Sequence, residues 1–294
     1  MKNHLINDLI DLGISESESF EIFHPKTRDL DSINVLKCKK SGVIVLDQIL
    51  RNKQYYIEAE KKGYTYLSDG LIKPKHLKDD LRRFESYKGY SKNSDVLDFG
   101  CGNGEFLSLI KKNSKSSIGI ELNQDNANFV NNMGIKCFSN LDNLPSNYCF
   151  DLITLNHVFE HLSDPIETLS NLIKHLKDDG TLIIEVPHAR DLLIEAFNVE
   201  AFKNFTFWSE HLILHTKESL IAFATKSGLK LKKIQGFQRY PISNHFNWLL
   251  NKKPGGHEIF SDLNNSSFHT EYEKYLQNLN LNDTLIGFFC KDLD

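Results

Sequence analysis

The segment LDFGCGNGEF, residues 97–106, places three glycines within five positions directly after a short apolar stretch. Glycine weakens strands and helix interiors, so such a cluster indicates a tight turn or a close approach of another group to the backbone. In an open parallel sheet, ligands bind at the carboxyl ends of the strands. The segment therefore predicts a strand, a ligand-binding loop and a helix, in that order.

Residues 93–237 alternate between apolar strand-like segments and amphipathic helix-like segments. Strict alternation implies right-handed crossovers and a mostly parallel sheet that helices cover on both faces. We expect an α/β fold with a Rossmann-like, doubly wound sheet and a late antiparallel strand at 283–293. The other expected strands are 95–99, 117–121, 150–156, 180–187 and 229–237, and the expected helices are 104–112, 124–133, 165–176 and 216–228.

Two regions flank this pattern. Residues 1–92 are mixed and include a strand–turn–strand pattern at 33–47 and a charged helix-like segment at 77–87. Residues 238–282 are rich in His, Asn and aromatic residues, and a long insertion between two late strands is usually functional. We expect a core of 93–237 with 283–294, an N-terminal cap and a lid at 238–282 that binds substrate.

Composition excludes several classes of function. The net charge is −4 and the lysines are dispersed, which argues against a nucleic-acid partner. No apolar run is long enough to span a bilayer, and the polar N-terminus does not resemble a signal peptide. The cysteines show no paired spacing, so they indicate reduced thiols in a cytoplasmic protein and no zinc site. They are Cys38, Cys101, Cys137, Cys149 and Cys290.

Three ligands compete for the glycine-rich loop. A nucleoside triphosphate loop would need Gly-Lys-Ser/Thr where this chain has Asn103-Gly104-Glu105. A nicotinamide dinucleotide favours G-x-G-x-x-G, but here the third glycine comes one residue early and Glu105 adds a negative charge. S-adenosylmethionine has no phosphate and carries a cationic sulfur, which suits the flanking acids Asp98 and Glu105. Glu121, at the end of the second strand, could accept hydrogen bonds from two ribose hydroxyls.

Four motifs occur in the order typical of class I S-adenosylmethionine-dependent methyltransferases, and the chain resembles that family over about residues 93–237. The motifs are VLDFGCGNGEFL (96–107), GIELN (119–123), FDLITLNHVFEHLSDP (150–165) and GTLIIEVP (180–187). The resemblance implies methyl transfer from S-adenosylmethionine, with S-adenosylhomocysteine as the product. It also indicates the small-molecule branch, similar to methyltransferases of bacterial sugars and surface polysaccharides.

The resemblance also implies the residues that bind the cofactor. This chain departs from the family after the third strand, where it has CFSNLDNLP. The family often has an acid there that binds the adenine amine. Asn140 or Asp142 could take that role, and Asn140, with Leu141 packed on the adenine ring, is favoured. The expected cofactor-binding residues are Asp98, Gly100, Cys101, Gly102, Gly104, Glu121, Leu122, Asn140, Leu141, Asn156 and His157.

Histidines after the late strands are candidates for a general base, which a hydroxyl or carbon acceptor needs. Glu210 and His211 have the form of an acid beside a base, and His161 is the second candidate. His157 and His161 lie at i and i+4, a spacing that binds zinc elsewhere, but no third ligand is evident and no metal is expected. The alternative for each histidine is a packing role.

The insertion supplies candidate acceptor-binding residues: Arg239, Tyr240, His245 and His257. These side chains suit a small polar acceptor that carries a sugar or a phosphate. The segment VLKCKKSGVIVL (35–46) resembles a degenerate form of the cysteine-rich segment of nucleotide-sugar C-methyltransferases, with Ser41 in place of the second cysteine. Arg28 and Tyr56 are further candidates from the cap.

Two other functions are compatible with a glycine-rich loop on this fold. One is a nicotinamide-dependent oxidoreductase, against which the glycine spacing argues. The other is a protein that binds S-adenosylmethionine without catalysis, against which the histidine-rich segments argue.

Overall fold

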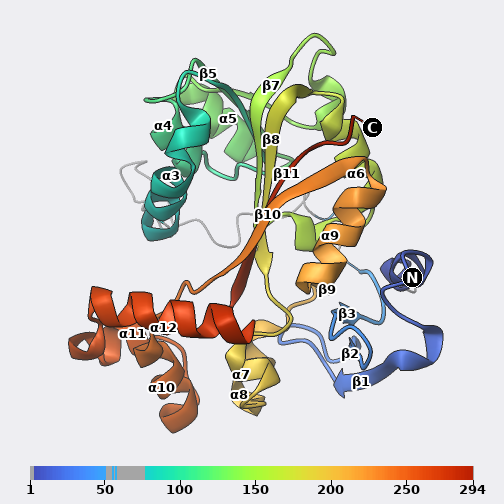
Figure 1. The fold of residues 1–294 in the computed structure, drawn as a ribbon, viewed down its shortest axis with the longest axis vertical. Helices are drawn as coiled ribbons and strands as arrows, with labels where there is room; N and C mark the ends of the chain where they lie inside the picture. The colour runs from blue at the N-terminus through green and yellow to red at the C-terminus, as the bar shows by residue number, and fades with distance from the viewer. Residues whose placement is uncertain (1–2, 51–54, 56, 58–76, 294) are drawn as a thin grey trace.

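The computed structural model describes residues 3–50, 55, 57 and 77–293; Tyr56 lies outside them. Its main sheet has seven strands in the order β10-β11-β8-β7-β4-β5-β6 (Figure 1). The strands from β8 to β6 are parallel, whereas β11 is antiparallel to both β8 and β10. This arrangement confirms the predicted fold class. The bounds are β4 Asp95–Phe99, β5 Ser116–Ile120, β6 Lys136–Phe138, β7 Phe150–Asn156, β8 Leu176–Pro187, β10 Leu229–Phe237 and β11 Thr284–Lys291.

Helices cover both faces of this sheet because successive strand residues point to opposite faces. On one face Val96 and Leu152 pack with residues of α3 and α4, and on the other Leu97 and Ile153 pack with residues of α6 and α9. Figure 1 shows these two helix pairs on opposite sides of the strands. The bounds are α3 Leu77–Ser91, α4 Glu105–Ile110, α5 Gln124–Asn132, α6 Pro165–Ile173 and α9 Lys217–Lys226.

A second, small antiparallel sheet has the order β1-β2-β3-β9. Its strands are β1 Phe20–His24, β2 Val35–Cys38, β3 Ile44–Leu46 and β9 Ile213–Leu214, and the N-terminal helix α1 Leu5–Asp11 packs beside it. Strands β2 and β3 form the hairpin expected within 33–47. Strand β9 was not predicted, and it ties the segment after His211 to the N-terminal region.

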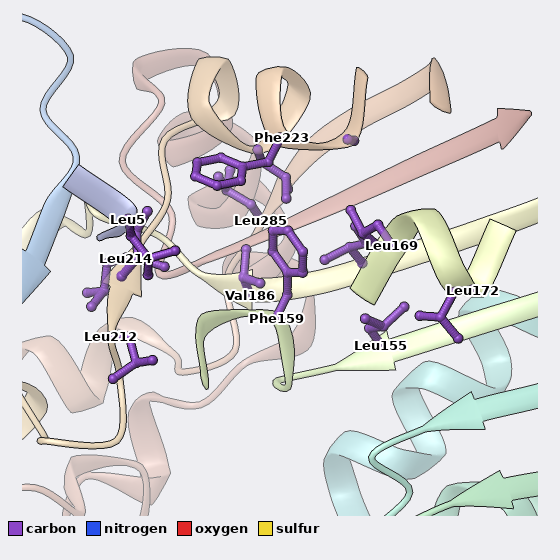
Figure 2. Packing of buried hydrophobic residues seen from close by; sticks show 14 of the residues in the cluster. Leu5, Leu155, Phe159, Leu169, Leu172, Val186, Leu212, Leu214, Phe223 and Leu285 are labelled. Carbon is purple, nitrogen blue, oxygen red and sulfur yellow. The ribbon is translucent and has the colours of Figure 1, made fainter. Parts of the chain in front are cut away.

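One hydrophobic core joins the two sheets. Figure 2 shows Phe159 and Phe223 packed near Val186 and Leu285, and Leu5 beside Leu214. The rings of Phe159 and Phe223 meet edge to face, with centroids 6.3 Å apart. The N-terminal region is therefore packed onto the core of the main sheet.

The hairpin turn carries a cluster of hydroxyls around one thiol. The Sγ atom of Cys38 lies 3.1 Å from Ser19 Oγ and 3.4 Å from the backbone N of Ser41. Burial raises the pKa of the Cys38 thiol, but hydrogen bonds from Ser15, Ser19 and Ser41 lower it to about 7. One thiol among three hydroxyls is not a zinc ligand set. All five cysteines, each within the described residues, are free.

The 238–282 insertion is helical. It contains α10 Ile242–Asn251, α11 Gly256–Ile259, a 3-10 turn at Ser261–Leu263 and α12 Ser266–Leu279. In Figure 1 these helices lie with α7 Leu192–Glu195, α8 Glu200–Thr206 and the small sheet in the lower half, beyond the carboxyl end of β8. Among the described helices, none is both long and apolar enough to cross a membrane.

Candidate active site

Two cavities lie side by side at the carboxyl ends of the parallel strands. The first cavity has a volume of about 630 Å³ and the second about 570 Å³. Both are lined by Gly100, Gly102, His157 and His161. These four residues mark the junction at which a molecule in one cavity would meet a molecule in the other.

The glycine-rich loop forms one wall of that junction. Gly100, Gly102 and Gly104 have φ angles of +74°, +55° and +76°, a region that side chains other than glycine rarely adopt. A Cβ on Gly100 would lie 2.5 Å from Val158 Cγ2. Gly104 lines neither cavity; a Cβ there would lie 2.8 Å from Val130, so it lets α4 start close against α5. Only the first two glycines are therefore placed to face a ligand.

Glu121, just past the end of β5, lines the second cavity. Its carboxylate accepts hydrogen bonds from the backbone N–H groups of Gly102 and Asn123, each at 2.8 Å. Burial raises the pKa of Glu121 in spite of these bonds. The predicted residues Leu122, Asn140 and Leu141 line the same cavity, and so does the alternative Asp142.

Asp98 lies within β4 and lines the first cavity. Its Oδ1 atom accepts hydrogen bonds from Thr154 Oγ1 at 2.6 Å and from Asn156 Nδ2 at 3.2 Å. Burial raises the pKa of Asp98 to about 7. Cys101 also lines this cavity, but its thiol lies 3.8 Å from the Sγ of Cys137.

These residues fit the predicted cofactor. A glycine loop without side chains leaves the backbone open, and the neighbouring carboxylate of Glu121 can accept hydrogen bonds from two ribose hydroxyls. Asp98 adds a carboxyl where a cationic amine would be favoured. The second cavity would then hold the adenosine part, and the junction would hold the methionine part.

A buried carboxylate lies between three histidines next to the junction. Glu160 is fully buried, with its Oε1 atom 3.2 Å from His157 Nδ1 and 3.7 Å from His161 Nε2. Burial raises the pKa of Glu160, but the hydrogen bond with His157 and the nearby His161 and His211 lower it to about 2. Glu160 is therefore ionised at working pH.

The predicted helical pair of His157 and His161 is not formed. His157 has φ +53° and lies outside the helical region, and Phe159–His161 forms a short 3-10 turn. His157 instead bridges two buried acids, with Glu160 on Nδ1 and Glu185 Oε1 3.3 Å from Nε2.

The predicted pairing of Glu210 with His211 is also wrong. The two adjacent side chains face different cavities: Glu210 lines the second and His211 the first. Tyr55 donates its hydroxyl to Glu210 Oε1 at 2.9 Å, whereas His211 Nδ1 has no hydrogen-bond partner among the described residues. Burial and then the charge of His161 lower the pKa of His211 to about 3. The acid near His211 is Glu160, which comes from a different part of the chain.

Glu160, His161 and His211 also form a set of metal-type ligands. Their ligand atoms lie within 4.8 Å of one another, and the rings of the two histidines are 5.0 Å apart. A carboxylate with two imidazoles suits zinc or ferrous iron. No third ligand is evident from the sequence because His211 lies 50 residues after His161; the fold brings them together.

The four predicted acceptor-binding residues, Arg239, Tyr240, His245 and His257, all line the first cavity. The guanidinium of Arg239 is already paired with Asp79 of α3. His245 Nδ1 lies 2.5 Å from the hydroxyl of Tyr272, and burial lowers the pKa of His245 to about 4. The first cavity is thus lined by the cap, the core and the insertion together.

Sequence reasoning missed two arginines of α3 that bind a buried acid. Arg82 donates to both oxygens of Glu185 on β8, at 2.7 and 2.8 Å. Arg83 donates to Oε1 of Glu185 through Nε and Nη2, at 3.1 and 2.8 Å, and also lines the first cavity. Glu185 is fully buried. The segment GTLIIEVP did indicate such a partner, because a carboxylate inside a buried apolar strand requires a cation beside it.

Comparisons with known proteins agree with this geometry. The family model described as "Methyltransferase domain" matches residues 72–234. The "Ubiquinone biosynthesis O-methyltransferase" of Coxiella burnetii (strain Dugway 5J108-111) is 25% identical over 196 residues, which cover 60% of this chain and 81% of that protein. The protein of the same name from Rickettsia canadensis (strain McKiel) is 22% identical over 179 residues, covering 56% of this chain and 75% of that protein.

A solved structure shares the fold. The crystal structure of a SAM-dependent methyltransferase from Archaeoglobus fulgidus superposes with a TM-score of 0.51 at 23% identity. The match covers 73% of this chain and 94% of that chain.

Proposed function

This chain belongs to the methyltransferase-domain family and is an S-adenosylmethionine-dependent methyltransferase, and we propose that it methylates a hydroxyl group on a small polar acceptor. The family membership excludes the two alternatives considered for the sequence, a nicotinamide-dependent oxidoreductase and a non-enzymatic binding protein. When bound, S-adenosylmethionine supplies an electrophilic methyl group. The residues that would hold it are the loop glycines Gly100 and Gly102, Asp98 and Glu121, with Leu141 beside the adenine.

A hydroxyl acceptor is supported by the relatives and by the site. The curated relatives are named as O-methyltransferases of ubiquinone biosynthesis. A hydroxyl must lose a proton during transfer, so it needs a general base. The buried pair of Glu160 and His161 supplies one at the junction of the cavities.

Charged and hydrogen-bonding side chains in the wall of the first cavity support a sugar-containing or phosphate-bearing acceptor rather than a quinone. Its wall includes Arg239, His245 and His257 from the insertion, the buried carboxyl of Asp191 and the half-buried carboxyl of Asp283. The family model ends at residue 234, before the insertion begins, so it does not describe this part of the site. Precursors of bacterial surface polysaccharides, to which the sequence resemblance points, have this chemistry.

We assign the base to His161. Its Nδ1 atom lies 2.8 Å from the backbone carbonyl oxygen of Glu210, so Nδ1 carries the proton and Nε2 is the nitrogen that would take up the proton of the acceptor. The carboxylate of Glu160, 3.7 Å from the same Nε2 atom, would then stabilise the imidazolium through its charge. His211 was the first candidate from sequence, but a pKa of about 3 makes it a weaker base.

The observation that best supports this proposal is geometric: Oε1 of the fully buried Glu160 lies 3.7 Å from Nε2 of His161, next to the junction of the two cavities. The test incubates the purified chain and S-adenosylmethionine with matched sets of sugars, sugar phosphates, nucleotide sugars and catechols. Mass spectrometry then identifies any methylated product and the atom that carries the methyl group. Methylation of an oxygen on a polar acceptor is expected; products from catechols alone would contradict the proposed acceptor.

A further inference from the structure

Arg28 lies on a tightly anchored turn at the rim of the first cavity. Its backbone N–H donates to the carbonyl of Phe207 at 2.8 Å. The next residue, Asp29, accepts hydrogen bonds from the backbone N–H and the hydroxyl of Ser209, at 3.0 and 2.5 Å. These bonds fix the turn to the segment just before His211, so the backbone of Arg28 has a well-defined position.

Aromatic rings hold the side chain of Arg28 as well. Its Cζ atom lies 4.0 Å from the ring centroid of Trp208 and 5.0 Å from that of Phe205. Its Nη1 atom donates to the carbonyl of Phe205 at 3.3 Å. All three residues line the first cavity. A guanidinium stacked through its face keeps the N–H groups on its edge available.

The charges around the cavity distinguish Arg28 from its neighbours. Two other arginines line the same cavity, and both are neutralised within the wall: Arg83 by Asp80 and Glu185, and Arg239 by Asp79. Arg28 forms no ion pair with any residue that the structure describes, and its Nε and Nη2 atoms donate to none of them. It is close enough to His211 to contribute to the lowered pKa of that histidine.

We propose that Arg28, stacked on Trp208, is an anion-binding subsite that holds a phosphate or carboxylate group of the acceptor. The proposal rests on the proposed function, because it assumes that the acceptor occupies the first cavity. The edge of a guanidinium matches the two oxygens of either anion, and the stacking reduces the entropy lost when they bind. Anionic acceptors would thereby be preferred over neutral analogues.

The experiment uses the full chain saturated with S-adenosylhomocysteine. Sodium pyrophosphate and, separately, sodium acetate are titrated at constant ionic strength, with tryptophan fluorescence as the readout, since Trp208 is one of only two tryptophans. The variants are Arg28→Ala and Arg28→Lys. Arg190→Ala is the matched control, because Arg190 is a partly exposed arginine that lines neither cavity.

We expect saturable binding of an anion to the wild-type chain and to Arg190→Ala, with affinity at least about 10-fold weaker in Arg28→Ala and partly restored in Arg28→Lys. Stronger binding of pyrophosphate would identify a phosphate-bearing acceptor, and stronger binding of acetate a carboxylate. Equal affinity in wild type and Arg28→Ala, or no saturable binding to the wild type, would overturn the subsite.

Calorimetry with S-adenosylhomocysteine separates this proposal from the proposed function. Unchanged affinity in Arg28→Ala shows that the variant is folded and that the donor site is intact. If Arg28→Ala loses that binding, Arg28→Gln, which keeps a polar side chain of similar length, takes its place in the same comparison. Failure of the wild-type chain to bind S-adenosylhomocysteine would count against the methyltransferase itself and not against the subsite.

Discussion

The imidazole of His161 donates its Nδ1 proton to the backbone carbonyl oxygen of Glu210, across 2.8 Å. His161 follows β7 of the main sheet, whereas Glu210 leads into β9 of the small sheet. The orientation of the proposed base therefore depends on how the N-terminal region packs against the core. A change in that packing would alter the tautomer and the position of the imidazole together.

The first prediction concerns the identity of the base. Replacing His161 with Ala should lower kcat by about 10²–10⁴-fold, because the acceptor hydroxyl loses its proton acceptor. His211→Ala should lower kcat much less. Turnover is measured as S-adenosylhomocysteine released, and calorimetry should give similar S-adenosylhomocysteine affinities for both variants.

His175→Ala is the matched control, because His175 also binds a backbone carbonyl, that of Tyr148 at 2.9 Å, but lines neither cavity. A larger loss in His211→Ala than in His161→Ala would assign the base to His211. Turnover should survive a chelator. Turnover that is lost on chelation and recovered with a divalent cation would instead assign Glu160, His161 and His211 to a metal.

The second prediction concerns the glycine loop. In Gly100→Ala the new methyl group would press on Val158, which lines the second cavity, so S-adenosylhomocysteine affinity should fall at least about 10-fold. Calorimetry measures this. Gly228→Ala is the control, since Gly228 has φ +90° but nothing within 4 Å of its added Cβ.

Both glycine variants should lose roughly 1–2 kcal/mol of unfolding free energy through the left-handed backbone, and Gly100→Ala should lose more because its Cβ also clashes with Val158. Only Gly100→Ala should lose affinity. Equal affinity in the two variants would mean that the loop has room for a side chain, contrary to the assigned donor site.

The sequence predicted the main sheet and its glycine loop because both depend on local patterns. Apolar strands such as 95–99 and 150–156 are short and distinct, and the glycines directly follow the first of them. Leu122 and Asn140, which were expected from the family resemblance, line the second cavity, because each follows a strand whose carboxyl end lies beside it.

The proposed catalytic pair, Glu160 and His161, could not be predicted in the same way. Glu210 and His211 are neighbours in sequence, but the extended chain that enters β9 turns them to different cavities. The partner acid, Glu160, lies in a 3-10 turn that the i, i+4 spacing of His157 and His161 had suggested to be a helix. Contacts between distant segments decided both outcomes.

The third prediction tests whether Arg239 joins the insertion to the cap. Arg239 and Asp79 form a mostly buried ion pair between the insertion and α3. Removing either partner should destabilise the chain, by about 3–5 kcal/mol, since the other charge stays buried. In a double-mutant cycle of Arg239→Gln and Asp79→Asn, urea unfolding should give a double variant about as stable as the weaker single variant.

The exposed pair of Glu85 and Lys88 on the same helix provides the matched control, with an expected coupling of about 0.2–1 kcal/mol. Additive losses for Arg239 and Asp79 would show that the pair does not hold these segments together. Arg239 would then be free to bind the acceptor, as the sequence suggested.

Asp191 is a buried carboxyl in the wall of the first cavity. It caps α7, where its side chain accepts a hydrogen bond from the backbone N–H of Leu193 at 2.7 Å. Burial, followed by the charge of Asp283, raises the pKa of Asp191 from 3.8 to about 8. The folded chain therefore holds a proton on Asp191 that the unfolded chain has lost at neutral pH.

The fourth prediction follows from that difference in bound protons. Between about pH 4 and pH 8 the folded state binds more protons at Asp191, so its contribution to stability is full below pH 4 and is lost as the pH rises to about 8. Asp191→Asn keeps the capping oxygen but cannot ionise. Its unfolding free energy, measured in urea at about pH 5, 7 and 9, should therefore rise relative to wild type by up to about 1.4 kcal/mol per pH unit and level off above pH 8. The contributions of other titrating groups largely cancel in this difference between the variant and the wild type. If the difference stayed constant with pH, Asp191 would already be ionised in the folded chain.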